Sequence, residues 1–448
     1  MVTHAISGSS LNDTPSGERV HIAFFGLRNA GKSSLVNAVT GQELSVVSEV
    51  KGTTTDPVRK AMELLPLGPV LIIDTPGLDD EGTLGELRVK RAMNVLANCD
   101  VAVLVHDSTS DFSQAERDLL ALFQSRNLPF IIAHNKSDLL NDVSNAEHDL
   151  PAAFRSTVIA YNKNDIPVAE GDLPAAFRST VIAHNKNGIP NDNNIYVSAL
   201  TGHNVNALKE KIASLAKKNV SEKRLVSDLL TKGDVVVLVV PVDKAAPKGR
   251  LILPQQQTIR DILDSGCSAF ICQDNELEHV LGTLNVKPRL VITDSQVFKK
   301  VDAVVPKDIM LTSFSILFAR YKGDLKTLVN GAEKLSHLKD GDKVLISEGC
   351  THHRQCGDIG TEKMPAWIRS FSHSEPEFKF TSGGEFPDSE SLKEFALIVH
   401  CGGCMLNEQE MHSRLERANM AGVPIVNYGV AIAEMHGILR RSLEPFNL

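Results

Sequence analysis

Val20-His21-Ile22-Ala23-Phe24-Phe25 is a short apolar run, and Gly26-Leu27-Arg28-Asn29-Ala30-Gly31-Lys32-Ser33 follows it directly. The second part has the pattern GxxxxGK(S/T) and a helical stretch comes after it, which is the strand, loop and helix context of a phosphate-binding P-loop. Glycines let backbone N–H groups close on phosphates, Lys32 offsets their charge, and the Ser33 hydroxyl can bind Mg²⁺. The stretch therefore predicts a nucleotide-binding α/β domain. The residues expected to contact the nucleotide here are Gly26, Asn29, Ala30, Gly31, Lys32, Ser33 and Ser34.

A second motif that is expected to lie beside the phosphates follows the apolar run 71–73. It reads Asp74-Thr75-Pro76-Gly77. Asp74 fits a carboxylate of the Mg²⁺ shell, and the N–H of Gly77 can sense the γ-phosphate. The pair of motifs therefore predicts nucleoside triphosphate chemistry.

Two motifs later in the chain are expected to recognise the nucleotide base. Asn135-Lys136-Ser137-Asp138 follows the apolar run 130–133, and Ser198-Ala199-Leu200 follows the run 195–197. Asp138 can accept two hydrogen bonds from the N1–H and amino groups of guanine, which adenine cannot offer, so GTP is expected rather than ATP. The last motif matches a second guanine-contacting loop.

An internal duplication complicates the choice of the guanine-reading motif. Residues 149–160 are repeated as 172–183, and the repeats bring two more Asn-Lys pairs. Residues 135–138 are preferred because they follow a strand at the usual distance beyond Asp74, and because the last copy has Gly188 in place of the aspartate. The duplicated insert, about 149–190, is interpreted as a surface loop or hairpin.

Length and charge limit the function classes. A chain of 448 residues is too long for one core and suggests about three domains. The net charge of -8 argues against a general nucleic-acid binder, which needs clustered Lys and Arg, and leaves open only a small local basic patch. No apolar run approaches the roughly 20 residues of a membrane helix, and residues 1–17 show no secretory signal. Seven cysteines, an odd number spread along the chain, favour a reducing, cytoplasmic location.

The remaining chain predicts two smaller α/β domains with largely parallel sheets. The apolar runs 234–240, 268–272 and 289–293 alternate with helical patterns, as in βαβ units. This middle part has no constellation of catalytic residues, and Cys267 and Cys272, like Cys99 earlier, are interpreted as buried core thiols. A long helix over 316–338 is then expected to lead into a last group of strands.

Cysteine and histidine gather at the ends of two of these last strands. Cys350-Thr351-His352 follows the run 344–347, and His400-Cys401-Gly402-Gly403-Cys404 follows the run 395–399. Both groups would lie at the carboxyl ends of buried strands, where open α/β sheets bind ligands. Three thiols and two imidazoles suit soft or borderline metals, and the spacing alone leaves zinc and an iron–sulfur cluster equally open.

Residues 19–220 resemble the small GTPases of the Era and tRNA-modification class. The resemblance of Gly52-Thr53-Thr54-Thr55-Asp56 to the first switch of that class implies Thr54 as an Mg²⁺-linked residue. It also implies a potassium ion on Asn29, and slow intrinsic hydrolysis because Leu78 stands where Ras-like proteins carry a water-orienting glutamine. The residues expected to act on GTP are Lys32, Thr54, Asp74 and Gly77, with Ser33, Thr54 and Asp74 on Mg²⁺.

Almost the whole chain resembles the [FeFe]-hydrogenase maturation GTPases, the HydF family. The evidence is the C-x-H and H-C-x-x-C pair joined to the GTPase motifs, together with residues 246–254, APKGRLILP. The resemblance leaves out the polar tail (1–18) and the duplicated insert. It implies a GTPase domain (19–220), a dimerisation domain (221–315) and an iron–sulfur domain (316–448). It also implies a [4Fe-4S] cluster on Cys350, Cys401 and Cys404, with His352, His400, water or another exchangeable group at the fourth position. Either histidine could instead donate a hydrogen bond to the ligands.

The same resemblance implies transient carriage of a di-iron precursor. The implied partners are the [FeFe]-hydrogenase apoprotein and radical-SAM maturation enzymes, and the implied assembly is a homodimer or larger, without nucleic acid or membrane. The alternative is a GTPase of RNA modification or ribosome assembly with a structural zinc module, which the acidic chain supports poorly. A redox enzyme is a third hypothesis, but no flavin or nicotinamide fingerprint accompanies the cysteines.

Overall fold

The computed structural model describes residues 14, 16–41, 58–77, 93–140, 193–218, 223–241, 251–349 and 358–448. The expected Thr54, Leu78, Cys350 and His352, and the duplicated insert, lie outside these residues. The chain falls into two compact units: Arg19–Val220, and Met1–Glu18 together with Ser221–Leu448. Among the described helices, none has the length and apolar character needed to cross a membrane.

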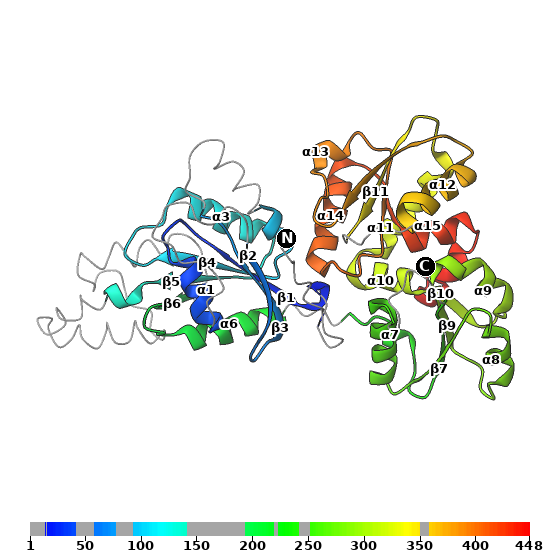
Figure 1. Ribbon diagram of the computed structural model, residues 1–448, viewed down its shortest axis with the longest axis horizontal. Helices are drawn as coiled ribbons and strands as arrows, with labels where there is room; N and C mark the ends of the chain where they lie inside the picture. The colour runs from blue at the N-terminus through cyan, green and yellow to red at the C-terminus, as the bar shows by residue number, and fades with distance from the viewer. Residues whose placement is uncertain are drawn as a thin grey trace, which may run out of the picture. The chain divides into compact units, whose positions relative to one another are not determined.

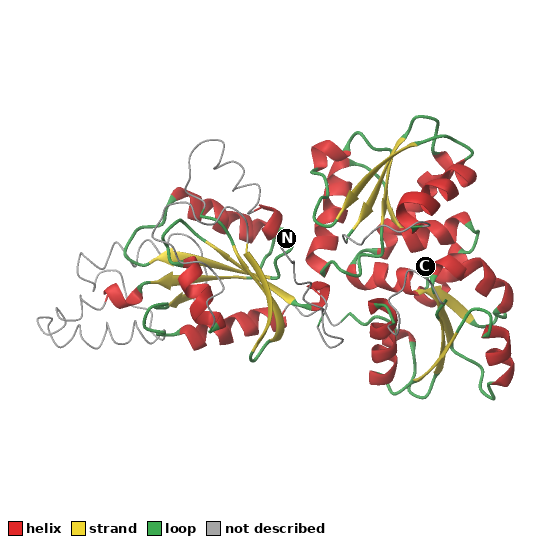
Figure 2. Cartoon of the chain, viewed as in Figure 1, coloured by secondary structure: helices red, strands yellow, loops and turns green. Residues whose placement is uncertain are grey.

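The first unit is built on a six-stranded sheet of order β2-β3-β1-β4-β5-β6 (Figures 1 and 2). Its neighbouring strands are parallel except β2, which runs antiparallel to β3. The strands are β1 (Val20–Phe25), β2 (Val58–Leu64), β3 (Gly68–Asp74), β4 (Val101–Asp107), β5 (Phe130–Asn135) and β6 (Asn194–Tyr196). The helices that cover it are α1 (Lys32–Thr40), α3 (Gln114–Ser125) and α6 (Val205–Lys218).

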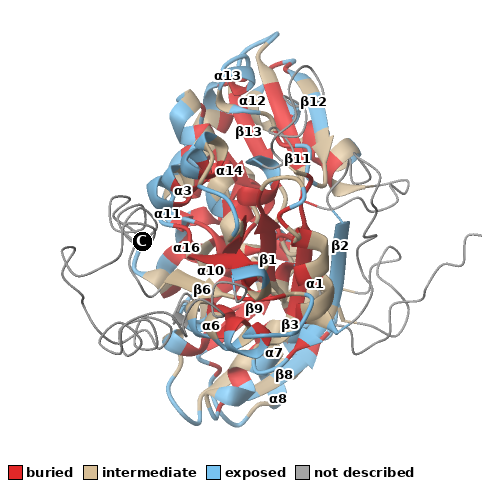
Figure 3. Ribbon diagram, turned by 90° about the vertical axis from the view of Figure 1, so that its left-hand side faces the viewer, coloured by how far each residue is buried: buried red, intermediate tan, exposed pale blue. Residues whose placement is uncertain are grey.

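The apolar run that forms β1 is continuous because both faces of the sheet are covered. Ile22 and Phe24 pack in the core that contains α1 and α6. Ala23 and Phe25 pack in the core that contains α3, on the opposite face (Figure 1). A central parallel strand therefore needs apolar residues at every position. The edge strand β2 is exposed along most of its length (Figure 3).

The second unit contains two four-stranded parallel sheets, as the sequence predicts, of orders β10-β9-β7-β8 and β12-β11-β13-β14. The first has β7 (Val235–Val239), β8 (Ser268–Cys272), β9 (Leu290–Thr293) and β10 (Met310–Ser313). The second has β11 (Lys343–Glu348), β12 (Glu377–Ser382), β13 (Leu397–His400) and β14 (Ile425–Asn427). Their further helices are α7 (Leu253–Asp264), α8 (Leu277–Thr283), α9 (Phe298–Val304), α12 (Met364–Ser372), α13 (Ser389–Leu392), α14 (Glu408–Ala421), α15 (Tyr428–Met435) and α16 (Leu439–Leu443).

The expectation of one long helix over 316–338 is wrong. The segment forms α10 (Phe314–Lys322), α11 (Leu325–Ala332) and a 3-10 turn, Glu333–His337. Gly323 leaves the helical conformation, with φ −130° and ψ −149°. The Asp324 carboxylate then accepts the backbone N–H of Lys326 at 3.0 Å and caps a new helix.

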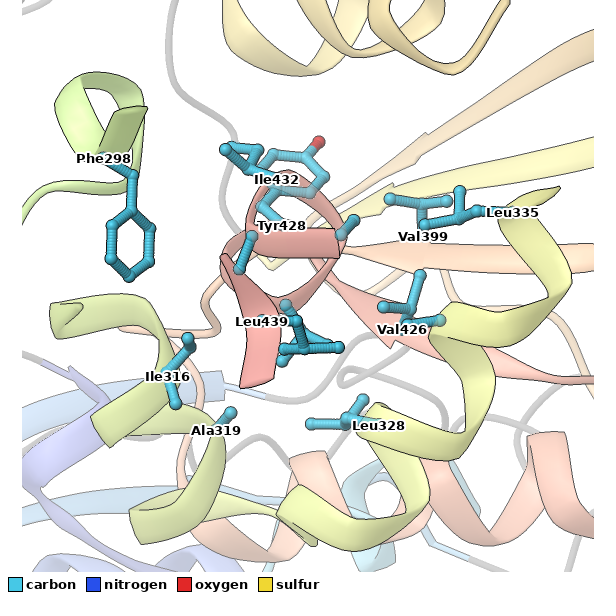
Figure 4. Packing of buried hydrophobic residues seen from close by; sticks show 14 of the residues in the cluster. Phe298, Ile316, Ala319, Leu328, Leu335, Val399, Val426, Tyr428, Ile432 and Leu439 are labelled. Carbon is cyan, nitrogen blue, oxygen red and sulfur yellow. The ribbon is translucent and has the colours of Figure 1, made fainter. Parts of the chain in front are cut away.

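The break lets both helices contribute to one core of the second unit. Ile316 of α10, Leu328 of α11 and Ile432 of α15 are buried in the same cluster (Figure 4). This cluster also contains residues of both four-stranded sheets, such as Val291 and Val399. The two sheets therefore share a hydrophobic core.

Arg414 of α14 ties together the carboxyl ends of the strands in the second sheet. Its guanidinium is fully buried and donates to Ser347 Oγ on β11 at 3.5 Å and to the carbonyl oxygen of Gly383, after β12, at 2.6 Å. A third bond, of 3.0 Å, joins it to His400 Nε2 on β13. The Glu410 carboxylate, 2.7 Å from Nε, balances the charge. A buried charge of this kind is tolerated only when it is paired and hydrogen-bonded.

Replacing Arg414 by leucine is expected to destabilise the second unit by about 3–5 kcal/mol, because Glu410 would be left as an uncompensated buried charge. The chain's single tryptophan, Trp367, lies in α12 of this unit, so urea unfolding followed by its fluorescence reports the effect. Arg414→Leu combined with Glu410→Leu should recover much of the loss. Arg417→Leu, on the same helix but only part-buried, is the matched control. Equal losses for Arg414→Leu and Arg417→Leu would contradict the prediction.

Candidate functional site

The P-loop of the first unit is shaped by two close backbone approaches. A Cβ at Gly26 would lie 2.2 Å from the carbonyl oxygen of Val105, and one at Gly31 would lie 2.2 Å from Asn135 Nδ2. Both glycines also have positive φ, 147° and 86°, so only glycine suits these positions. Lys32 Nζ donates to the carbonyl oxygens of Gly26 at 3.1 Å and Leu27 at 2.6 Å, which holds the ammonium against the loop.

Of the three residues expected to bind Mg²⁺, Ser33 and Asp74 are in the described part of the chain, and they lie together. Ser33 Oγ donates to Asp74 Oδ2 at 2.7 Å, and Asp74 is only 2% exposed at the end of β3. The second carboxylate oxygen, Oδ1, is buried without a hydrogen-bond partner in the described part of the chain. A hydroxyl beside a buried carboxylate with one uncommitted oxygen fits Mg²⁺, which takes oxygen ligands. Gly77 approaches the P-loop, since a Cβ there would lie 3.0 Å from Arg28 Cα.

Asn135 joins the P-loop to the two loops expected to read guanine. Its Nδ2 donates to the carbonyl oxygen of Ala30 at 3.0 Å, and its Oδ1 accepts the N–H of Ala199 at 3.0 Å. The side chain is buried, with 2% exposed. Lys136 Nζ forms an ion pair of 2.5 Å with Asp107, at the end of β4, which the sequence did not single out. The lysine lowers the pKa of Asp107 by hydrogen bonding and charge, against the opposing effect of burial.

The other residues expected to contact the nucleotide differ in how far they are buried. Asn29 is exposed with φ 62°, and Ser34 is half-buried in α1. Asp138 is half-buried, while Ser198 is fully buried and accepts the N–H of Thr201 at 3.1 Å. The structure thus brings most of the described candidates to the carboxyl ends of β1, β3, β5 and β6.

Cys401 follows β13, and its sulfur already accepts hydrogen bonds from the backbone. The N–H of Gly349 lies 3.0 Å from Cys401 Sγ, and the N–H of Gly403 lies 3.4 Å from it. Gly403 has φ 65°, the left-handed region that glycine tolerates best. Burial raises the pKa of the Cys401 thiol to about 11, although these two N–H groups oppose the rise. Donors directed at sulfur favour thiolate once a metal replaces the proton.

Cys404 lies beside a buried ammonium. Lys322, at the end of α10, donates to the carbonyl oxygens of Cys404 at 3.2 Å and Leu406 at 2.8 Å. Burial raises the pKa of Cys404, and the Lys322 charge opposes the rise. Lys322 was not expected from the sequence because it lies far from the cysteine motif. A cation, backbone donors and thiols form an environment that fits an anionic metal–thiolate centre.

His400 uses both ring nitrogens within the protein. Its Nε2 lies 3.0 Å from Arg414 Nη1, and its Nδ1 lies 2.7 Å from the carbonyl oxygen of Cys401. Because a guanidinium only donates, Nε2 must accept and Nδ1 must donate. Burial lowers the pKa of His400 to about 3, so the ring is neutral. This arrangement orients the backbone of Cys401.

No group of three or more Cys, His, Asp or Glu placed to hold a metal occurs among the described residues. Cys350 and His352 fall outside that part of the chain, so of the expected ligands only Cys401, Cys404 and His400 are placed. Cys99, Cys267 and Cys272 are buried elsewhere, as the sequence indicates.

The first unit is similar to curated GTPases. GTPase Der of Kosmotoga olearia is 35% identical over 143 residues, 30% of this chain and 32% of that protein. The tRNA modification GTPase MnmE of Laribacter hongkongensis is 35% identical over 128 residues, 28% of each chain. The chain thus spans about a third of the length of these relatives. A structure of Aquifex aeolicus Era bound to GDP.AlF4- matches at TM-score 0.33 and 19% identity, over 56% of this chain and 91% of that one.

Models of protein domains match all three parts of the chain. The 50S ribosome-binding GTPase domain matches residues 21–136. The Hydrogen maturase F dimerization domain matches residues 225–323, and the Hydrogen maturase F tetramerization domain matches residues 326–445. A GTPase domain followed by both maturase domains confirms the family resemblance of the sequence. The chain belongs to the HydF family of hydrogenase maturation GTPases.

Proposed function

We propose that this protein hydrolyses GTP, binds a [4Fe-4S] cluster on Cys350, Cys401 and Cys404, and carries a di-iron precursor to the [FeFe]-hydrogenase apoprotein. The observation that carries the proposal is the pair of backbone N–H groups directed at Cys401 Sγ at the end of β13. Radical-SAM maturation enzymes would supply the precursor, and the cytoplasm is the expected compartment. The domains would be those expected from the sequence, with boundaries near residues 18, 220 and 315.

The GTPase residues have distinct parts in the proposed reaction. Lys32 balances the charge of the β- and γ-phosphates, and Gly77 N–H reports the presence of the γ-phosphate. Ser33, Asp74 and Thr54 would hold Mg²⁺, which would offset the negative charge of the phosphates. Asp138 and the loop of Ser198 and Ala199 would recognise guanine, and Asn135 ties that loop to the P-loop through its hydrogen bonds to Ala199 and Ala30. Hydrolysis would be slow because Leu78 cannot orient water.

The cysteine residues have a separate part. Three thiolates would leave one iron of the cluster free to take an exchangeable group, which suits a carrier. His400 would hold the backbone of Cys401 through Nδ1, and Arg414 would hold His400 in the tautomer that this requires.

Cysteine variants test the cluster directly. After anaerobic reconstitution, the wild type should contain about four iron and four sulfide per chain with a matching EPR signal on reduction. Cys401→Ala should lose the signal, because a ligand is removed. Cys272→Ala, which removes a buried thiol remote from the motif, should retain it. Zinc without iron in the wild type would overturn the proposal and favour a structural zinc module.

Potassium dependence tests the part given to Asn29. GTP hydrolysis should be about ten-fold or more faster in potassium than in sodium, since the ion would supply some of the charge stabilisation of an arginine finger. Asn29→Ala should remove the difference, whereas Arg28→Ala, in the same loop, should keep it. The ratio of rates in the two salts is measured at saturating GTP. Equal wild-type rates in both salts would refute the role.

The exposed edge of β8 is the surface we propose for the homodimer. β8 is the last strand of its sheet, and its apolar Phe270 and Ile271 are 45% and 49% exposed. An unpaired edge with exposed apolar side chains is a template for pairing with a second chain. It lies in the part of the chain that matches a dimerization domain.

A charge on this edge should therefore separate the subunits. Ile271→Lys is expected to lower the mass measured by light scattering, because two edges cannot pair across buried ammonium groups. Leu263→Lys is the control, since Leu263 is 57% exposed on α7 of the same domain. Retention of the wild-type mass by Ile271→Lys would exclude β8 as the interface.

A further inference from the structure

A short 3-10 turn before the first strand, Ser16–Glu18, packs against the loop that follows Cys404. Gly17 is buried, and a Cβ there would lie 2.7 Å from the carbonyl oxygen of Leu406 and 2.9 Å from the carbonyl carbon of Met405. The turn belongs to the same compact unit as that loop. Glycine is therefore required at residue 17 for the close approach.

Glu18 and the cysteine loop share one buried cation. Lys322 Nζ lies 2.9 Å from Glu18 Oε1, which is an ion-pair distance. The same ammonium donates to the carbonyl oxygens of Cys404 and Leu406. The Lys322 side chain is only 3% exposed. Because a buried ammonium needs its compensating charge, displacement of Glu18 must disturb the contacts to the cysteine loop.

The next residues are anchored in the GTPase unit. Arg19 Nη1 donates to the carbonyl oxygen of Met62 in β2 at 3.2 Å, and Val20 pairs with Val70 of β3. Glu18, which pairs with Lys322, and Arg19, which donates to Met62, are therefore consecutive residues with no linker between them.

The β2–β3 hairpin that holds Arg19 lies between the two nucleotide-sensing motifs. The expected switch residue Thr54 precedes β2 in the sequence, and Asp74 ends β3. In GTPases the γ-phosphate and Mg²⁺ order the segments that contact them, and hydrolysis releases those segments. A movement of the hairpin would therefore act on residues 19 and 20 through these two contacts.

We propose that Glu18 and Lys322 are positioning residues that make the conformation of the Cys404 loop depend on the bound nucleotide. A shift of the β2–β3 hairpin moves Arg19 and Val20, and with them Glu18. The hydrogen bonds from Lys322 to the carbonyl oxygens of Cys404 and Leu406 then change. The inference rests on the proposed function only in giving Cys404 a ligand's role. By linkage, the state of the cysteine loop must also alter nucleotide affinity.

The test measures thiol accessibility in the full-length apoprotein, so it needs no cluster. The rate of Cys404 alkylation by N-ethylmaleimide is followed by peptide mass spectrometry at saturating GDP or non-hydrolysable GTP analogue. In the wild type, the two rates should differ by at least about five-fold, the lower end of ordinary allosteric coupling. Glu18→Gln and Lys322→Met should each reduce the difference to less than about two-fold, which is below that range.

Matched variants distinguish nucleotide-dependent alkylation of Cys404 from a general destabilisation of its loop. Glu408→Gln removes an exposed ion pair with Lys223 at the start of α14 and should keep the wild-type ratio. Gly17→Ala should abolish the ratio by steric contact with Leu406, whereas Gly384→Ala, which has open space around it, should not.

Two outcomes overturn the inference: equal alkylation rates in both nucleotide states of the wild type, or an undiminished ratio in both Glu18→Gln and Lys322→Met. Iron and sulfide contents, measured separately, decide the proposed cluster. If the protein assembles the cluster but its alkylation does not depend on the nucleotide, the coupling is refuted and the proposed cluster still stands.

Discussion

Parallel strand pairing is the constraint on which both units depend. Because neighbouring strands run the same way, their carboxyl ends meet at one edge, and the loops leaving them are brought together from distant parts of the sequence. In the first unit this edge collects the P-loop after β1, Asp74 at the end of β3 and Asn135 at the end of β5. In the second unit it brings Gly349, after β11, within 3.0 Å of the Cys401 sulfur, after β13.

Buried cations hold this edge in place in the second unit. Arg414 links three strand ends, and Lys322 links the loop after Cys404 to Glu18. Each has a carboxylate partner, as a charge removed from water requires. Such pairs contribute less to net stability than to a single defined arrangement, which is what a thiolate site needs.

The parts of the fold that the sequence predicts are those with a local signal. Continuous apolar runs predict β7 and the central strands, because helices cover both sides of their sheets. β8 also has an apolar run, although it is a largely exposed edge strand. β12 escaped detection since it is a largely exposed edge strand without an apolar run. The break at Gly323 and Asp324 was missed because the apolar periodicity continues through it. Lys322 and Arg414 could not be predicted, since their partners lie far away in the sequence.

We propose that the carboxyl ends of the strands in the second unit hold iron. Anomalous diffraction at the iron edge from crystals of the reconstituted protein tests it most directly. One strong iron peak is expected within bonding distance of the sulfurs of Cys350, Cys401 and Cys404. A peak that appears at the zinc edge only, or iron bound away from Cys401, would contradict it.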